Sequence, residues 1–405
     1  MPKTYVDENV YTAAKKRMKD IFNTFPKLYL AFSGGKDSTV MLHLALEVAE
    51  SENRLPLDVL FVDLEGQFNT TIKHIENVAL DPEKINLHWI CLPLNLRNSV
   101  SVFQPHWRCW DPEQSGMWVR PMPQHAQVVS DIEYYPFFRF GMEFEDFVYE
   151  WGKWFSGGEL CTCLLGIRSD ESLNRFFSVT TNGWLGKNWM SRASEKLVFS
   201  YPIYDWRTED IWRYIGKKKL TYNKLYDYFY LCGISIHKMR ICQPYGDDQR
   251  QSLVYYHMIE PSTWNKILAR VHGVNFGAVY SKTAVLGRIK VVLPEGLTWK
   301  KYTQILLQSM PEITRHHYEE KIETFLHWWE NNGFPSELVP DQANLKLENA
   351  GKIPSWRRIC KCIVKNDWWC RSLGFSQTKK TYETLYAKKE HNEPKHKTGY
   401  PEHSS

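Results

Sequence analysis

The chain has 405 residues, of which 43% are hydrophobic and 24% charged, and its formal net charge is +5. These values exclude a disordered chain, and so small a charge for this length does not point to nucleic acid. No run approaches the roughly 20 apolar residues of a membrane span, the N-terminus lacks the apolar segment of a signal peptide, and the nine cysteines lack the spacing of a disulfide framework. We therefore expect a cytoplasmic protein that does not contact a membrane.

Helices and strands are expected to alternate in the first half of the sequence. Amphipathic helices are predicted over 8–25, after residue 35, near 69–80 and over 143–155, and apolar strands over 28–32, 59–62, 89–92, 164–167 and 197–203. Such alternation predicts a mostly parallel sheet covered by helices, with ligands bound at the carboxyl ends of its strands. Residues 96–142 break the pattern and are expected to form a long ordered insertion near that site.

The second half of the sequence is expected to be mostly helical. The predicted helices cover 208–215, 223–232, 249–258, 262–271, 298–332 and 355–373. We therefore divide the chain into an N-terminal helix (1–25), an α/β domain (26–274), a smaller helical module (275–375) and a polar tail (376–405).

The segment Ser33–Ser38, Ser-Gly-Gly-Lys-Asp-Ser, connects the first expected strand to the following helix. Its two glycines let backbone N–H groups approach phosphate oxygens, and the helix directs the positive end of its dipole at the same charge. Ser33 and Ser38 add hydroxyl donors and Lys36 adds a cation, while Asp37 is placed to cap the helix or to hold magnesium. The spacing is not that of the Walker loop, so the segment predicts a phosphate-binding loop of another kind. The alternative is a tight turn without a ligand.

Several stretches resemble a known family in their order along the chain. Phe32–Thr39 resembles the SGGKDS signature of the PP-loop nucleotide α-hydrolase superfamily, and specifically its phosphoadenosine phosphosulfate (PAPS) reductase family. The stretches that match further motifs of this family are Phe61–Asp63, Gly166–Arg175 and Tyr201–Trp212. Met239–Cys242 and Ile353–Cys360 are similar to a narrower bacterial group with a C-terminal domain of unknown function, some of whose members are labelled co-activators of prophage gene expression.

This resemblance implies a Rossmann-like α/β/α sandwich that binds ATP or a PAPS-like adenine nucleotide. In the ATP-using members of the superfamily, a substrate oxygen attacks the α-phosphate, pyrophosphate leaves, and a nucleophile then displaces the adenylylated intermediate. Magnesium would neutralise the leaving pyrophosphate, and Asp37 and Asp63 are its candidate ligands. For Asp63 the alternative is a buried structural acid. Together with Lys36 and Arg168, these two acids are the catalytic candidates.

Two arginines are candidate anion ligands, because Arg168 follows an expected strand and Arg175 lies about two helical turns further on. The planar fork of arginine suits phosphate or sulfate, and Glu171 is placed to orient one of the two side chains. The alternative is a surface ion-pair network. The full set of expected nucleotide-binding residues is Ser33, Gly34, Gly35, Lys36, Asp37, Ser38, Thr39, Asp63, Gly166, Arg168, Glu171 and Arg175.

The cysteines bear on the choice of reaction. True PAPS reductases resemble one another in a C-terminal Glu-Cys-Gly-(Leu/Ile)-His motif whose thiolate attacks sulfur, and this sequence lacks the motif. Cys161 and Cys163 are candidates for a thiol placed elsewhere, with core packing as the alternative. Cys360, Cys362 and Cys370, with Cys242 as a further candidate, lack the paired spacing of a strong metal site, so neither zinc nor an iron–sulfur cluster is expected.

The expected partners are an adenine nucleotide and another protein. Two stretches make nucleic acid a further candidate. Gln104–Trp110 combines aromatic side chains with an arginine, which suits either stacking on a base or packing over the site. Trp356–Arg358 has the same character, and its alternative is an interface between parts of the chain.

Taken together, these features predict an ATP-dependent PP-loop enzyme that releases pyrophosphate and adenylylates a substrate, in sulfur transfer or nucleic-acid modification. One alternative is a sulfonucleotide reductase with a non-standard cysteine. The other is a non-catalytic, nucleotide-sensing regulatory subunit linked to phage or DNA processes.

Overall fold

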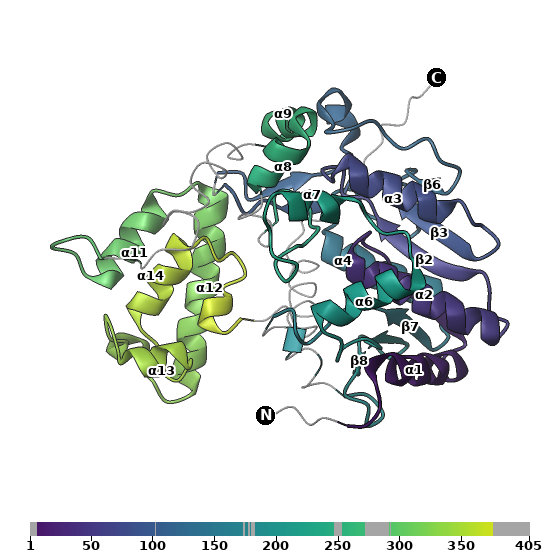
Figure 1. Cartoon of the computed structure of the whole chain (residues 1–405). Coiled ribbons are helices and arrows are strands. Elements are labelled where there is room, and N and C mark those ends of the chain that lie inside the picture. The colour runs from purple at the N-terminus through teal and green to yellow at the C-terminus, as the bar shows by residue number, and fades with distance from the viewer. Residues whose placement is uncertain are drawn as a thin grey trace, which may run out of the picture. The chain divides into compact units, whose positions relative to one another are not determined.

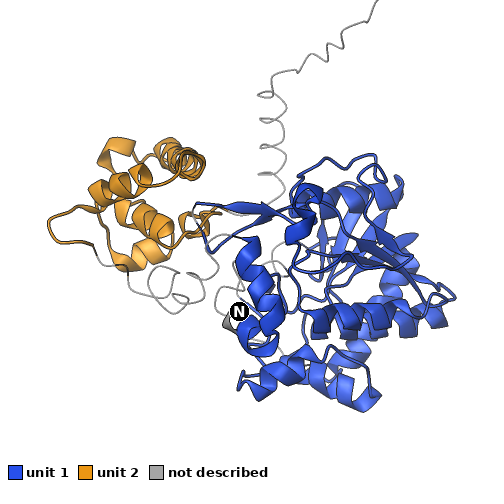
Figure 2. Cartoon of the chain, turned by 90° about the horizontal axis from the view of Figure 1, so that it is seen from above, with its two compact units in different colours: residues 1–282 blue, residues 283–405 orange. Residues whose placement is uncertain are grey.

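The computed structural model describes residues 6–101, 103–172, 175–176, 179, 183–246, 253–271, 291 and 293–375, so the tail expected at 376–405 lies outside the described residues. The chain divides into two compact units, residues 1–282 and 283–405, which Figure 2 shows in blue and orange. Each unit has a hydrophobic core of its own. Within the described residues, no helix combines the length and the apolar character that a membrane crossing requires.

A seven-stranded sheet forms the centre of the first unit (Figure 1). Its strands lie in the order β6-β3-β2-β1-β7-β9-β8, and all neighbours are parallel except β8 and β9. The strands are β1 (Lys27–Ala31), β2 (Leu57–Val62), β3 (Ile85–Ile90), β6 (Val128–Val129), β7 (Cys161–Leu164), β8 (Met190–Arg192) and β9 (Leu197–Ser200).

Strand β1 lies in the middle of this sheet. Its Leu30 pairs with Val59 of β2 on one side and with Leu164 of β7 on the other. The segment that follows β1 therefore leaves the sheet between the ends of β2 and β7, which is where parallel sheets bind their ligands.

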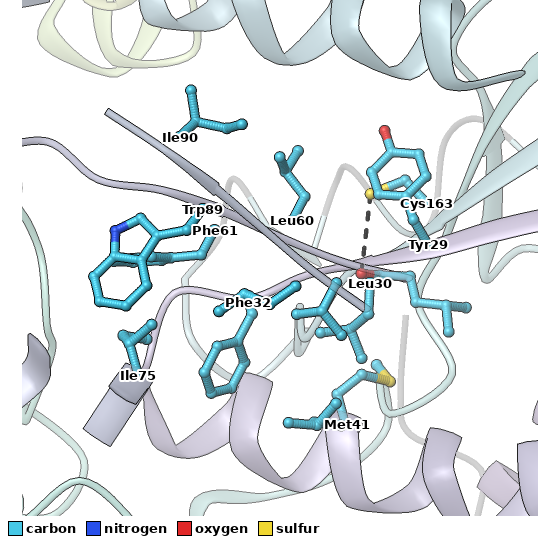
Figure 3. Close-up of a cluster of buried hydrophobic side chains, with 14 of the residues drawn as sticks. Tyr29, Leu30, Phe32, Met41, Leu60, Phe61, Ile75, Trp89, Ile90 and Cys163 are labelled. Atoms are coloured by element: carbon cyan, nitrogen blue, oxygen red, sulfur yellow. Dashed lines mark hydrogen bonds between the residues drawn. The ribbon is translucent and has the colours of Figure 1, made fainter. Parts of the chain in front are cut away.

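Helices cover both faces of the sheet, which makes the expected Rossmann-like sandwich. Figure 3 shows Met41 and Ile75 on one side of the strands and Tyr29 on the other. The ring of Tyr29 packs edge-on against Trp151, with 4.9 Å between the ring centroids. The helices of this unit are α1 (Val10–Thr24), α2 (Lys36–Ser51), α3 (Asn69–Ala79), α4 (Phe144–Ser156), α6 (Thr208–Lys218), α7 (Leu225–Leu231), α8 (Leu253–Ile259) and α9 (Pro261–Arg270).

The insertion at 96–142 is more regular than its sequence suggests. Strands β4 (Asn95–Arg97) and β5 (His106–Arg108) form an antiparallel pair, and a 3-10 helix, η1, covers Pro112–Met117. Its last strand, β6, extends the main sheet beside β3. A strand of two residues carries no periodic pattern, which explains why the sequence did not reveal it.

Two expected strands begin earlier than predicted. The strand expected at 164–167 lies at Cys161–Leu164, because its pairing with β1 starts at Lys27 opposite Cys161. The apolar residues after it, Leu165–Ile167, line a cleft instead. The strand expected at 89–92 likewise begins at Ile85, and the apolar run Trp89–Leu92 covers only its end.

The second unit is helical. Its elements are α11 (Trp299–Gln308), α12 (Glu312–Asn331), η3 (Ser336–Leu338), α13 (Leu345–Asn349), α14 (Trp356–Val364) and η4 (Arg371–Leu373). The helix expected over 298–332 is two helices, because Pro311 cannot continue the first and instead begins the second. The helix expected over 355–373 ends at Val364, and Cys362 and Cys370 pack in the core of this unit.

Candidate functional site

The loop after β1 has the geometry of a phosphate cradle. Gly34 has a φ of +71°, and a Cβ atom there would lie 3.0 Å from Cγ2 of Thr71, so both the backbone angle and the space require glycine. Gly35 precedes the first turn of α2 without a side-chain cap. The N–H groups of that turn are therefore directed at the end of the sheet, where they favour an anion.

A cleft of about 440 Å³ opens beside this loop. Strand ends, the first turn of α2 and the segment 239–243 contribute to its wall. Of the expected nucleotide-binding residues, those that line it are Ser33, Gly35, Lys36, Asp37, Ser38, Gly166, Glu171 and Arg175, whereas Gly34, Thr39, Asp63 and Arg168 do not. The structure therefore brings most of the expected set into one cleft.

Asp37 links two cations at the bottom of the loop. Lys36, only 4% exposed, places Nζ 2.8 Å from one carboxylate oxygen of Asp37, and Arg168 donates from Nε to the other at 2.6 Å. Arg168 is buried and also donates to the backbone carbonyl of Trp206 at 3.4 Å. Arg168, which the sequence predicted as an anion ligand, does not line the cleft and instead contacts Asp37, which does.

Gly166 permits this arrangement by its lack of a side chain. A Cβ atom at Gly166 would lie 3.1 Å from the backbone nitrogen of Ser38 and 3.1 Å from the backbone carbon of Asp37. Both atoms belong to the first turn of α2 and cannot yield as a flexible side chain would. The segment after β7 can therefore approach the phosphate loop only with glycine at this position.

Further charged groups line the cleft. Arg175 places Nε 3.3 Å from a carboxylate oxygen of Glu171, and Arg240 donates to the backbone carbonyl of Glu171 at 2.8 Å. Together with Lys36, these arginines give the lining three cations against the two carboxylates of Asp37 and Glu171. Because Arg175 is 40% exposed, a ligand can reach it, and the excess of positive charge favours an anionic one.

Asp63 lies outside the cleft and is fully buried. One carboxylate oxygen accepts the backbone N–H of Glu65 at 3.0 Å and pairs with Arg120, and the other accepts the indole N–H of Trp89 at 2.9 Å. This saturated environment is that of the buried structural acid, so we leave Asp63 out of the site.

Several cleft residues were not expected from the sequence. Tyr226 of α7 lines the cleft and accepts the backbone N–H of Lys36 at 2.9 Å, although 190 positions separate the two residues. Gln67 is buried in the lining, and its side-chain oxygen has no hydrogen-bond partner among the residues that the structure describes. A buried acceptor of this kind is satisfied when a ligand supplies the donor.

The cysteines fall into two groups. Cys161 and Cys163 are buried in β7, and burial raises the pKa of each thiol to about 12. Cys242, in contrast, is half-buried and lines the cleft. The stretch that contains Cys242 was noticed in the sequence, but nothing in its pattern indicated that it faces the phosphate loop.

Two tryptophans and two arginines that were considered for nucleic-acid contact are engaged within the protein. Trp107 and Trp110 of the insertion are 3% and 2% exposed, so neither presents a ring for stacking on a base. In the second unit, Arg357 donates to Glu348 at 2.9 Å, and the buried Arg358 donates to the backbone carbonyl of Ile353 at 2.6 Å.

The comparisons with known proteins identify the family. Residues 27–232 match the phosphoadenosine phosphosulfate reductase domain, and residues 233–339 and 335–384 match a domain of unknown function, DUF3440. The chain therefore belongs to the PAPS reductase domain family, with a nucleotide-binding fold of the PP-loop type. This confirms the expected family, its C-terminal domain and the α/β fold with a helical C-terminal region.

Individual relatives extend over different lengths. The uncharacterized protein YbdN of Escherichia coli is 41% identical in an alignment of 385 residues that covers 93% of each chain. Sulfate adenylyltransferase subunit 2 of Magnetococcus marinus is 26% identical over 52% of this chain and 63% of its own. A crystal structure of PAPS reductase from Candida auris aligns over 60% of this chain and 98% of its own, with 14% identity and a TM-score of 0.32.

Proposed function

We propose that the chain is a PP-loop enzyme that binds ATP, cleaves it at the α-phosphate and transfers the adenylyl group to an acceptor. The observation that carries this proposal is the cleft beside the phosphate loop, in which Lys36 is held by Asp37 and backed by the buried Arg168. One relative is named a sulfate adenylyltransferase subunit, which agrees with adenylyl transfer as the reaction type.

The proposed step is a displacement at the α-phosphorus. An acceptor oxygen forms a bond to that phosphorus, the bond to the oxygen that bridges to the β-phosphate breaks, and pyrophosphate leaves with the electron pair. Lys36 exchanges Asp37 for a phosphate oxygen as charge develops there, and the hydroxyl of Ser33 donates from the loop, while that of Ser38 donates to the backbone carbonyl of Gly35 at 3.0 Å. The fixed positions of these donors supply the orientation that the displacement needs.

The carboxylates do not fit a magnesium site built by the protein. Both oxygens of Asp37 are engaged by cations, and Asp63 lies outside the cleft. In the described part of the chain, no three His, Cys, Asp or Glu side chains are grouped as metal ligands. The proposed step therefore rests on Lys36, the Ser33 hydroxyl and the backbone N–H groups of the loop.

Pyrophosphate release from ATP by the full chain tests this function. We expect Lys36→Ala to lower the rate at least about 100-fold, the usual effect of removing a donor from developing charge. Lys153→Ala is the matched control, because Lys153 is an exposed lysine of α4 that pairs with Glu150 and does not line the cleft. Inorganic sulfate, RNA and DNA serve as candidate acceptors. Tight ATP binding without pyrophosphate under all these conditions would favour the nucleotide-sensing subunit instead.

A second candidate function is supported by one specific residue. Cys242 brings a thiol into the cleft, which a sulfonucleotide reductase requires and which Cys161 and Cys163 do not provide. In that reaction the Cys242 thiolate forms a bond to the sulfuryl sulfur, and the nucleoside phosphate leaves with the electron pair of the broken S–O bond. A dithiol reductant then releases sulfite, is oxidised to its disulfide and restores the thiol.

Sulfite release from a sulfonucleotide and a dithiol distinguishes the two functions. This candidate predicts that Cys242→Ser abolishes sulfite release, whereas Cys232→Ser, a half-buried cysteine that does not line the cleft, leaves it intact. Pyrophosphate release that survives in Cys242→Ser would support the adenylyl-transfer proposal.

A further inference from the structure

The start of α7 is fastened to the phosphate loop. Asn223 is fully buried, and its side-chain nitrogen donates to the backbone carbonyl of Gly34 at 3.1 Å and to the hydroxyl of Thr71 at 2.9 Å. Its side-chain oxygen accepts the backbone N–H of Leu225, the first residue of α7, at 3.0 Å. The position of α7 is therefore tied to the conformation of the loop.

Tyr226, the second residue of α7, places its hydroxyl against the phosphate loop. The Tyr226 oxygen accepts the backbone N–H of Lys36 at 2.9 Å, a donor that has no partner inside α2. A Cβ atom on Gly35 would lie 3.3 Å from the Ser33 hydroxyl oxygen, 3.4 Å from that of Tyr226 and 4.0 Å from that of Ser38. Hydroxyls from two distant parts of the chain therefore surround the same point of the loop.

The phenolic proton of Tyr226 has no acceptor among the residues that the structure describes. The oxygen already accepts from Lys36, so its own proton is left to donate, and Tyr226 lines the cleft. The side chain is 3% exposed, and Trp212 and Phe229 hold the ring by edge contacts at centroid distances of 5.4 and 6.2 Å. Burial, assisted by the charge of Asp37, raises the pKa of Tyr226 above its usual value, so the proton stays on the oxygen at neutral pH.

We propose that Tyr226 is a phosphate ligand and forms a hydrogen-bond relay from the backbone N–H of Lys36, at the start of α2, to the nucleotide. Its oxygen accepts from the Lys36 N–H while its proton is donated to a phosphate oxygen. A hydrogen bond to a charged acceptor is stronger than one between neutral groups, and a chain of two bonds polarises in the same direction. This inference rests on the proposed function, because it needs a phosphate in the cleft.

The test measures dissociation constants of ATP, pyrophosphate and adenosine for the full chain and two variants. Tyr226→Phe removes the hydroxyl and keeps the ring. Tyr222→Phe is the matched control, because Tyr222 also packs against Trp212, at 5.5 Å, but donates its proton to Asp227 at 2.6 Å and does not line the cleft. We expect Tyr226→Phe to weaken ATP and pyrophosphate by about 10- to 100-fold and to leave adenosine unchanged, with Tyr222→Phe like the wild type.

The remaining outcomes each overturn the relay. Unchanged ATP affinity in Tyr226→Phe would mean that the proton does not reach phosphate. Tighter ATP binding would mean that the hydroxyl blocks the Lys36 N–H. An equal loss for adenosine would mean that the variant only disturbs the fold. A wild-type chain that binds neither ATP nor pyrophosphate would refute the proposed function and the relay together.

Discussion

Asp37 and Asp63 follow neighbouring strands of one sheet, and each pairs with an arginine, yet their surroundings differ. Asp63 is fully enclosed, and both of its oxygens are occupied by Arg120, Trp89 and a backbone N–H. Asp37 lines the cleft with 14% of its side chain exposed and shares its charge between Arg168 and a lysine. The enclosed acid stabilises the fold. In the proposed function, a ligand replaces the acid in the cleft as the partner of Lys36.

The enclosed acid is one of two buried acids that hold the insertion 96–142 against the end of β2. Two residues further along, Glu65 is also fully buried and accepts from Arg270 at 2.8 Å and from the backbone N–H groups of Trp110 and Val119 at 2.7 and 3.0 Å. Arg270 belongs to α9, so this acid ties a late helix as well as the insertion to the end of β2.

The largest effect is expected when the partner of the enclosed acid is removed. Arg120→Ala leaves Asp63 buried without a counter-charge, and we expect the free energy of unfolding to fall by about 3–5 kcal/mol. Urea unfolding measures this. Asp63→Asn combined with Arg120→Leu should recover part of the loss, because neither charge then remains unpaired. A loss below about 1 kcal/mol would show that Asp63 is not the structural acid described here.

The acid in the cleft should respond differently. Asp37→Asn removes the charge that holds Lys36, and we expect pyrophosphate release to fall roughly 100-fold, equivalent to about 2.7 kcal/mol. ATP should bind as tightly as before or more tightly, because the carboxylate no longer competes with phosphate for the lysine. Titration calorimetry beside the rate assay separates the two effects. A parallel loss of both would mean that Asp37 serves the fold as Asp63 does.

A buried histidine beside the loop makes the stability of the folded protein depend on pH. His74 lies 3.1 Å from the hydroxyl of Thr39, and burial, with a smaller contribution from His43, lowers the pKa of His74 to about 4. The folded protein therefore binds this proton less tightly than the unfolded chain does. The corresponding stability is fully present above the unfolded pKa of about 6.5 and is lost as the pH falls toward 4.

We expect protonation of His74 to lower the free energy of unfolding of the wild type by about 2 kcal/mol as the pH falls from 7 to 4.5. The measurement is urea unfolding at both pH values for the wild type and for His74→Gln, whose amide keeps a donor for Thr39. The difference between the two proteins isolates this histidine from other groups that titrate. Equal pH dependence in both would place the titration elsewhere.

The smallest effect is expected at an ion pair that, unlike Asp37 and Asp63, is exposed to solvent. Glu150 and Lys153 of α4 lie 3.0 Å apart, with side chains 30% and 47% exposed. Water screens such a pair, so Glu150→Gln should change the free energy of unfolding by less than about 0.5 kcal/mol. A larger change would imply that burial is not what separates Asp63 from an ordinary acid.

Local patterns were sufficient to predict much of this molecule. The alternation of apolar strands and amphipathic helices predicted the parallel sheet, and Ser33, Lys36 and Asp37 line the cleft because strand, loop and helix are adjacent in sequence. The apolar periodicity over 298–332 predicts one helix, but Pro311 separates two helices there. Proline cannot continue a helix, so this single residue outweighs the periodic pattern.

The rest depended on tertiary contacts. An arginine after a strand is equally compatible with touching a ligand and with supporting an acid, and only the packing put Arg168 behind Asp37. Tyr226 and Cys242 lie in segments whose apolar patterns predict helix or loop and nothing more. Their roles follow from where the chain returns to the end of β1, which no local periodicity encodes.

The distances along the chain at this site bear on how the protein is made. During synthesis the phosphate loop emerges early, but its supports come much later, since Asp37 and Arg168 are 131 positions apart and Lys36 and Tyr226 are 190 apart. A nascent chain, or a truncated gene product, that stops before Asn223 carries the whole family signature around an unfinished cradle. We therefore expect that, in a series of chains of increasing length, nucleotide affinity appears when α7 is included and not when the motif alone is present.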